Sequence, residues 1–162
     1  MRYVLLLISL LLVTSVTAQE PMPYGAPISL EHARKLIAAA EVEAKKNSLP
    51  VVIAIVDSGA HLVALARMDN TQLGSVEVAI AKARCSALFR RATKVYEDGL
   101  ITGGANNRVL KAPEVLPIEG GIPIVVDGKI IGANLLKMDR WHRLPWMRSK
   151  RAFRKSRTER TG

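Results

Sequence analysis

The chain has 162 residues, 49% of them hydrophobic, so it is long enough for one domain with an ordinary buried core. Its formal net charge of +10 would suggest nucleic acid or an anionic membrane surface as partner. The charge is unevenly distributed, because residues 1–133 hold 14 Lys and Arg against 12 Asp and Glu, whereas residues 134–162 hold 10 against 2. The basic character belongs to the C-terminal tail, and we do not expect the domain to bind nucleic acid.

The first 18 residues have the pattern of a secretory signal peptide. Arg2 supplies a positive start, residues 4–13 form an apolar run, and small residues precede a predicted cleavage after Ala18. The run is shorter than the roughly 20 residues that a membrane span needs, so we expect no stable membrane anchor. The sequence therefore predicts a secreted or periplasmic protein. Residues 19–28 are rich in proline and are interpreted as a flexible linker.

Cys85 is the only cysteine, so no internal disulfide can form in the oxidising compartment that export implies. One interpretation is an intermolecular bridge or a reactive thiol. The other is a small buried hydrophobic residue on a helix.

The domain is predicted to begin with a helix capped by Ser29 and ended by Asn47 and Pro50. Its apolar positions follow the 3.6-residue period and are Leu30, Ala33, Ile37, Ala40 and Ala44. The run VVIAIV, residues 51–56, predicts a strand covered on both faces, and HLVALARM, residues 61–68, predicts its hairpin partner.

A second helix is predicted over residues 73–91, with an apolar stripe formed by Leu73, Val76, Ile80, Ala83 and Ala87. Residues 93–121 are interrupted by glycine and proline and are predicted to be a long loop, which in a compact domain is often functional. The last hairpin, residues 122–133, turns at Asp127-Gly128, which tolerates the positive φ angles of a tight turn. This order predicts an α+β domain with a mainly antiparallel sheet.

The common catalytic motifs are absent: there is no G-x-S-x-G, H-E-x-x-H, C-x-x-C or G-x-G-x-x-G after a strand. Asp57, Ser58 and His61 are a triad by type, but they lie within one turn, where the serine and histidine are not expected to point at each other. No turnover reaction is predicted from a motif.

Histidine and arginine residues are the remaining candidates for chemistry. By the period of two, His61, Val63, Leu65 and Arg67 would share one face of the second strand. This mix suits a flat amphipathic ligand such as haem, with imidazole for the iron and guanidinium for a propionate. His32, in the first turn of the first helix, is a possible second metal ligand. The alternative is a solvated histidine and an arginine that protects an edge strand.

Two motifs carry a resemblance to a known family. They are D-x-G-x-x-L-x-A-x-x-R-M-D, from Asp57 to Asp69, and G-G-x-P-I-V-x-D-G-K-x-I-G-A, from Gly120 to Ala133. With SLEHARKLIAAAEVEAKK before them, they resemble the GlcG/HbpS family of haem-binding and haem-degrading proteins over residues 29–133. The resemblance implies a profilin-like fold with a five-stranded antiparallel sheet, assembly into homo-oligomers, and haem or another tetrapyrrole as ligand. No family motif fixes the iron ligand here.

The tail, residues 134–162, departs from that family. Members typically continue as GAIGVSG and end with an alanine-rich helix, whereas this chain reads NLLKMDRWHRL, so the last strand is expected to be truncated. A shifted reading frame would explain the abrupt change. A basic tail that binds an anionic surface or nucleic acid through Trp141 and Trp146, or an inert extension, are the alternatives. His142 lies in this tail.

Overall fold

The computed structural model describes residues 20–135. The predicted signal peptide, residues 136–162 of the tail and His142 lie outside this range. The elements are helices α1 (Leu30–Lys46), α2 (Ser75–Phe89) and α3 (Lys94–Thr102), the 3-10 helix η1 (Gly104–Lys111), and strands β1 (Val52–Asp57), β2 (Leu62–Arg67), β3 (Gly121–Val126) and β4 (Lys129–Leu135). The predicted α+β class is confirmed.

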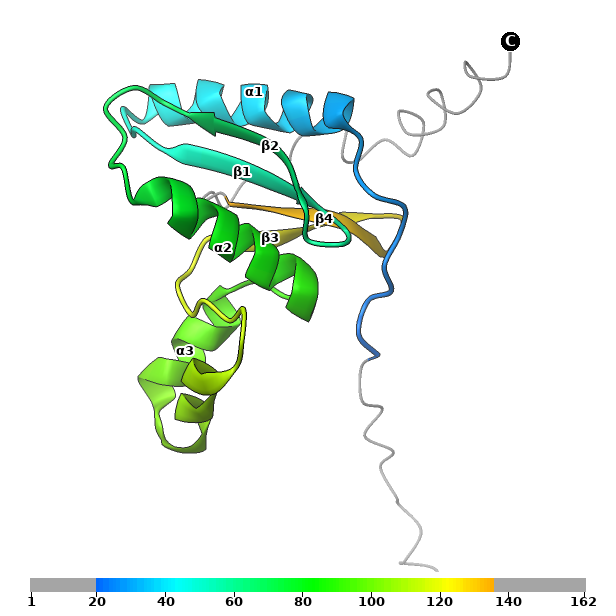
Figure 1. The fold of residues 1–162 in the computed structure, drawn as a ribbon, viewed down its shortest axis with the longest axis vertical. Helices are drawn as coiled ribbons and strands as arrows, with labels where there is room; N and C mark the ends of the chain where they lie inside the picture. The colour runs from blue at the N-terminus through cyan, green and yellow to red at the C-terminus, as the bar shows by residue number, and fades with distance from the viewer. Residues whose placement is uncertain (1–19, 136–162) are drawn as a thin grey trace, which may run out of the picture.

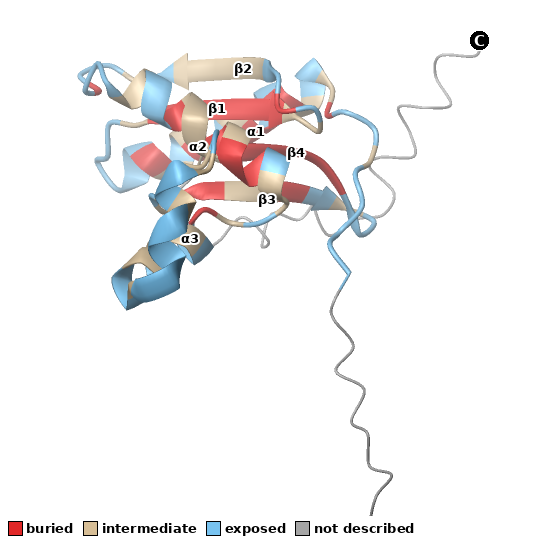
Figure 2. Cartoon of the chain, turned by 60° about the horizontal axis from the view of Figure 1, so that its bottom comes forward, coloured by how far each residue is buried: buried red, intermediate tan, exposed pale blue. Residues whose placement is uncertain are grey.

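A sheet in the order β2-β1-β4-β3, with every neighbouring pair antiparallel, forms the centre of the domain. The described residues give it four strands, one fewer than the resemblance implies. Residues 52–56 of β1 are all buried, because α1 covers one face and α2 the other (Figures 1 and 2). Alternate β1 residues join different clusters: Ile53 and Ile55 pack with α1, and Val52 and Ala54 with α2. The prediction of a strand covered on both faces is confirmed.

Helix α1 begins where the sequence predicts. The Ser29 side chain accepts a hydrogen bond from the backbone N–H of His32, and the helix ends at the Asn47 cap. Its buried residues are Ala33, Leu36, Ala40 and Ala44. The predicted stripe was wrong at its start, since Leu30 is exposed and Leu36 takes its place in the core.

Helix α2 is shorter than predicted. Leu73 precedes it and is 76% exposed, so it does not belong to the packed stripe. Cys85 is fully buried in this helix, and burial raises the pKa of its thiol. The interpretation as a buried hydrophobic residue is therefore the one that fits, because a reactive thiol needs exposure and a lowered pKa.

The last hairpin explains the glycines of its motif. Asp127 and Gly128 both have positive φ, 49° and 73°, as the predicted tight turn requires. A Cβ on Gly121 would lie 2.3 Å from the carbonyl oxygen of Lys82 in α2, and one on Gly132 would lie 2.3 Å from that of Val56 in β1. These two glycines allow the hairpin to approach the helix and the central strand closely.

Strand β4 continues through Asn134 and Leu135, two residues beyond the predicted end of the domain, with Asn134 paired to Ile55. Asn134 is buried, and its side-chain Oδ1 has no hydrogen-bond partner among residues 20–135. An unsatisfied buried acceptor costs about 1–3 kcal/mol. The departure from the family pattern therefore begins inside the sheet.

The segment before α1 is bound to the sheet, so the predicted flexible linker over residues 19–28 is wrong for residues 23–28. Gly25 N–H donates to the Ile130 carbonyl, Ile130 N–H donates to the Pro23 carbonyl, and Ile28 N–H donates to the Ile131 carbonyl. β1 ends at Asp57, which pairs with Gly132, so the start of β4 is free on that side to pair with this segment.

The predicted long loop contains α3 and η1, which project from the sheet next to α2 (Figure 1). The prediction of a loop was wrong because tertiary and side-chain contacts outweigh its glycines. Thr93, fully buried, donates its hydroxyl hydrogen to the Ile118 carbonyl at 2.7 Å and accepts from Gly121 N–H at 3.0 Å. Lys94 and Asp98 form an ion pair of 2.7 Å at i,i+4 spacing, which supports a helix.

Candidate functional site

The turn between β1 and β2 fixes the position of His61. One carboxylate oxygen of Asp57, Oδ1, accepts hydrogen bonds from the backbone N–H groups of Gly59 at 2.8 Å and His61 at 2.9 Å. Nδ1 of His61 lies 3.5 Å from the same oxygen, and the His61 side chain is 80% exposed. Histidines that bind metals usually turn one ring nitrogen toward a carboxylate in this way. The carboxylate therefore lies on the Nδ1 side of the exposed ring, which leaves Nε2 available to a bound group.

The predicted shared face of β2 is wrong, because the strand contains a β-bulge. Ala64 pairs with Ile55, and Leu62 pairs with Val56, so the register shifts between them. Val63 packs against the α1 cluster, whereas Leu65 packs against the α2 cluster. Arg67 is exposed at the far end of the strand, about 20 Å from His61 along the chain at 3.3 Å per residue. The structure does not bring the two side chains together.

His32 is half-buried at the start of α1. Its Nδ1 lies 2.8 Å from the Ser29 hydroxyl oxygen. Burial lowers the pKa of His32, and the nearby Lys35 ammonium lowers it further. A lowered pKa keeps the imidazole neutral at physiological pH, the form that binds a metal.

The two histidines have different polar partners, Ser29 and Asp57. Residues 20–135 contain no group of three or more His, Cys, Asp or Glu side chains that could hold a metal ion. In this part of the chain, each histidine could therefore supply a single imidazole nitrogen to a bound metal or cofactor.

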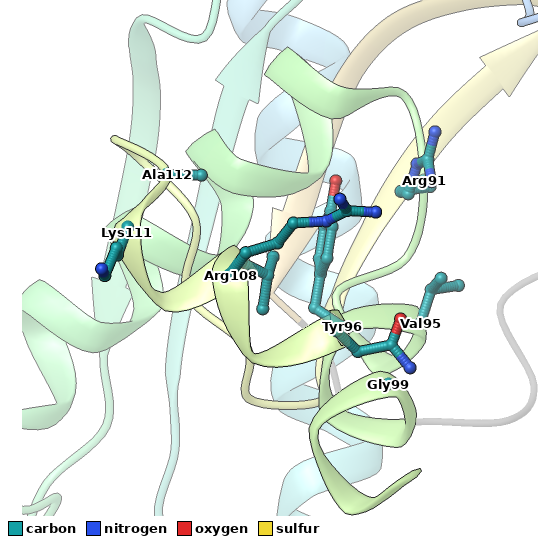
Figure 3. Close-up of a pocket in the computed structure, with 9 residues that line it drawn as sticks. Arg91, Val95, Tyr96, Gly99, Arg108, Lys111 and Ala112 are labelled. Atoms are coloured by element: carbon teal, nitrogen blue, oxygen red, sulfur yellow. The ribbon is translucent and has the colours of Figure 1, made fainter. Parts of the chain in front are cut away.

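A pocket of about 630 Å³ lies between α3 and η1 (Figure 3). This volume is in the range of small-molecule and cofactor sites. It is lined by Arg91, Val95, Tyr96, Gly99, Asn106, Arg108, Val109, Lys111 and Ala112. All three charged residues of this lining are cations, and the lining contains no carboxylate.

Tyr96 forms the aromatic wall of the pocket. Its ring makes an edge contact with Phe89 at 5.9 Å between centroids, and the Arg91 guanidinium lies 5.8 Å from its centroid. In Figure 3 the Arg108 side chain extends across the pocket toward Tyr96, and Lys111 lies at the other end. Burial raises the pKa of Tyr96, which keeps its phenol a hydrogen-bond donor at neutral pH.

Sequence reasoning missed this pocket because it treated residues 93–121 as a loop. Two signals were present: the i,i+4 spacing of Lys94 and Asp98, and the regular spacing of Val95, Tyr96 and Gly99 along one turn. Neither predicts that η1 folds back onto α3.

The family model for "Haem degrading protein HbpS-like" matches residues 28–135. The chain belongs to this HbpS-like family. Protein GlcG of Escherichia coli K12 is 44% identical over 106 residues, which cover 65% of this chain and 78% of GlcG. An uncharacterized 15.0 kDa protein of Citrobacter freundii is 29% identical over 110 residues, an alignment that covers 67% of this chain and 78% of the Citrobacter protein.

Solved structures of related proteins share the fold. Klebsiella pneumoniae ORFY aligns with a TM-score of 0.66 at 22% identity, covering 73% of this chain and 83% of ORFY. A PduOC:heme complex aligns with a TM-score of 0.62 at 27% identity, over 69% of this chain and 83% of PduOC. HbpS aligns with a TM-score of 0.62 at 24% identity, over 68% of this chain and 77% of HbpS. The HbpS-like assignment made from the two motifs is confirmed.

Within residues 20–135, no helix of this HbpS-like protein is long and apolar enough to cross a membrane. The expectation of no membrane anchor concerned residues 1–18, which lie outside the described part of the chain.

Proposed function

We propose that this HbpS-like protein binds haem or a related tetrapyrrole, with His61 as the first candidate for iron ligand and His32 as the second. The observation that carries the proposal is the Asp57–His61 pair, an exposed imidazole beside a carboxylate in a chain whose family is described as haem degrading. The PduOC:heme complex, at 27% identity, supports the choice of ligand. A haem iron held by imidazole would supply redox chemistry that the side chains themselves lack.

Arg67 is the weakest member of the predicted site. Its proposed role was to pair with a propionate of haem bound at His61, and the β-bulge removes the shared face on which that role depended. We therefore expect Arg67→Ala to bind haemin like the wild type.

Titration of haemin into the purified protein, followed by the Soret band, tests the proposal. We expect a saturable shift for the wild type that is lost or displaced in His61→Ala, because the imidazole that would hold the iron is removed. His32→Ala tests the second candidate, and His142→Ala, the third histidine of the chain, is the control. The absence of any saturable shift in the wild type would refute haem binding, whereas a shift retained in both His61→Ala and His32→Ala would refute the site.

Haem degradation is the second candidate function, favoured by the family description. If the protein degrades haem, the bound pigment will lose its absorbance and release iron when a reductant or peroxide is supplied. A binding or sensing protein will leave the pigment intact under the same conditions.

We also propose that the protein is exported after cleavage behind Ala18 and that it forms homo-oligomers. N-terminal sequencing of exported protein should begin at Gln19, and light scattering should give a mass above that of one chain. An uncleaved N-terminus or a monomeric mass would contradict the respective proposal.

A further inference from the structure

The charged residues that line the pocket between α3 and η1 are all positive. Its three cations, Arg91, Arg108 and Lys111, face a lining without a single carboxylate. Within residues 20–135, no ion pair or hydrogen bond involves the side chain of Arg108 or Lys111. Arg108 and Lys111 are exposed, and two cations without a partner beside a cavity favour an anionic occupant.

The acidic residues of the same segment, Glu97, Asp98, Glu114 and Glu119, all lie outside the pocket lining. Asp98 pairs with Lys94, and Glu114 pairs with Arg84 of α2 at 3.2 Å. Glu97 accepts a hydrogen bond from the backbone N–H of Glu119. None of these carboxylates is part of the lining, so the charged groups that border the cavity itself are all cations.

The remaining lining selects the shape of the ligand. Tyr96 is braced by Phe89 on its edge and offers a ring for stacking, while Val95 and Val109 supply apolar contact. Arg91 donates its Nε–H to the Phe89 carbonyl at 3.2 Å, and this bond holds the guanidinium over the Tyr96 ring. The other N–H groups of the guanidinium are left for a ligand.

We propose that this pocket binds an organic polycarboxylate with an apolar or planar body, and that Arg108 and Lys111 pair with its acid groups. The carboxylates could come from a tetrapyrrole or from a small free dicarboxylic acid, since both offer the same anionic groups. The inference goes beyond the proposed iron coordination and does not rest on it, because it requires neither histidine nor iron.

Metal-free protoporphyrin IX is the probe, since it has two carboxylates on a flat ring and no iron, and its dimethyl ester is the uncharged counterpart. Followed by porphyrin fluorescence, the wild type should bind the acid, and the double variant Arg108→Ser/Lys111→Ser should bind it about tenfold or more weakly. Arg34→Ser/Lys129→Ser removes two exposed cations from outside the pocket lining and is the control. Thermal unfolding checks that all variants fold.

Succinate distinguishes the two sources. Displacement of the porphyrin by succinate, or calorimetric binding of succinate alone, indicates that a small dicarboxylate suffices; no displacement indicates that the pocket needs the larger ring. Equal binding of the acid and the ester, equal affinity in the double variant, or binding of neither probe overturns the inference. A failed haemin shift with intact binding of metal-free porphyrin would refute only the iron coordination.

Discussion

The body of the domain and the α3–η1 segment are built on different principles. In the body, β1 is buried on both faces, and α1 and α2 each contribute several fully buried residues. In α3 and η1 no residue is buried, and the large side chains of Val95, Ile101 and Leu110 are exposed. The body is held by apolar burial, whereas the segment depends on a few polar anchors and the contact between its two helices. Its local stability should therefore be lower than that of the body.

The largest expected effect is in the body. Gly121→Ala would place a Cβ 2.3 Å from the Lys82 carbonyl oxygen, so α2 and β3 must separate. We expect a loss of about 3 kcal/mol or more in the free energy of unfolding, measured by urea denaturation. Gly74→Ala is the matched control, because no atom lies within 4 Å of its added Cβ and its φ is −63°. Similar stabilities for the two variants would show that the close approach is not a constraint.

A smaller effect is expected at the anchor between body and segment. Thr93→Val removes the hydroxyl that bonds both the Ile118 carbonyl and the Gly121 N–H, leaving the buried N–H and the partly buried carbonyl unsatisfied. We expect the free energy of unfolding to fall by about 2 kcal/mol. Relative to the wild type, amide hydrogen exchange should become faster in α3 by more than it does in α2. Thr102→Val, an exposed threonine at the end of α3, should cost less than about 0.5 kcal/mol. Unchanged exchange in α3 would contradict the role of Thr93 as an anchor.

The smallest expected effect is a pH dependence at His32. Its pKa is lowered below 6.5 by burial and by Lys35, so the unfolded chain takes up the proton before the folded chain does. Stability should therefore fall as the pH drops through 6.5 toward the folded pKa, and be fully present above 6.5. His32→Gln should show a shallower decrease between pH 7.5 and 5.5 in urea denaturation. Equal slopes would contradict the prediction.

Sequence reasoning predicted the body well because its signals are local. The Ser29 cap, the β-branched run of β1 and the Asp127-Gly128 turn each specify their element within a few residues. The bulge at Val63 was not predictable, because it depends on how β2 meets β1 and leaves no mark in the alternation of residues.

The site was predicted only in part for the same reason. His61 could be singled out by residue type, and its contact with Asp57 four residues earlier is a property of the turn. The pocket could not be found, because it depends on η1 folding against α3 and on Thr93 bonding to residues 25 and 28 positions later. Non-local hydrogen bonds of this kind are invisible to periodicity.

Because Cys85 is buried, the rate at which its thiol reacts can report how often the domain opens around α2. It is the only thiol in 162 residues, and α2 packs it out of contact with solvent. A thiol reagent can therefore modify the protein only during excursions that expose α2, and the labelling rate measures how often they occur without any added probe. Ligand binding that stabilises the closed body should slow that rate in proportion to occupancy.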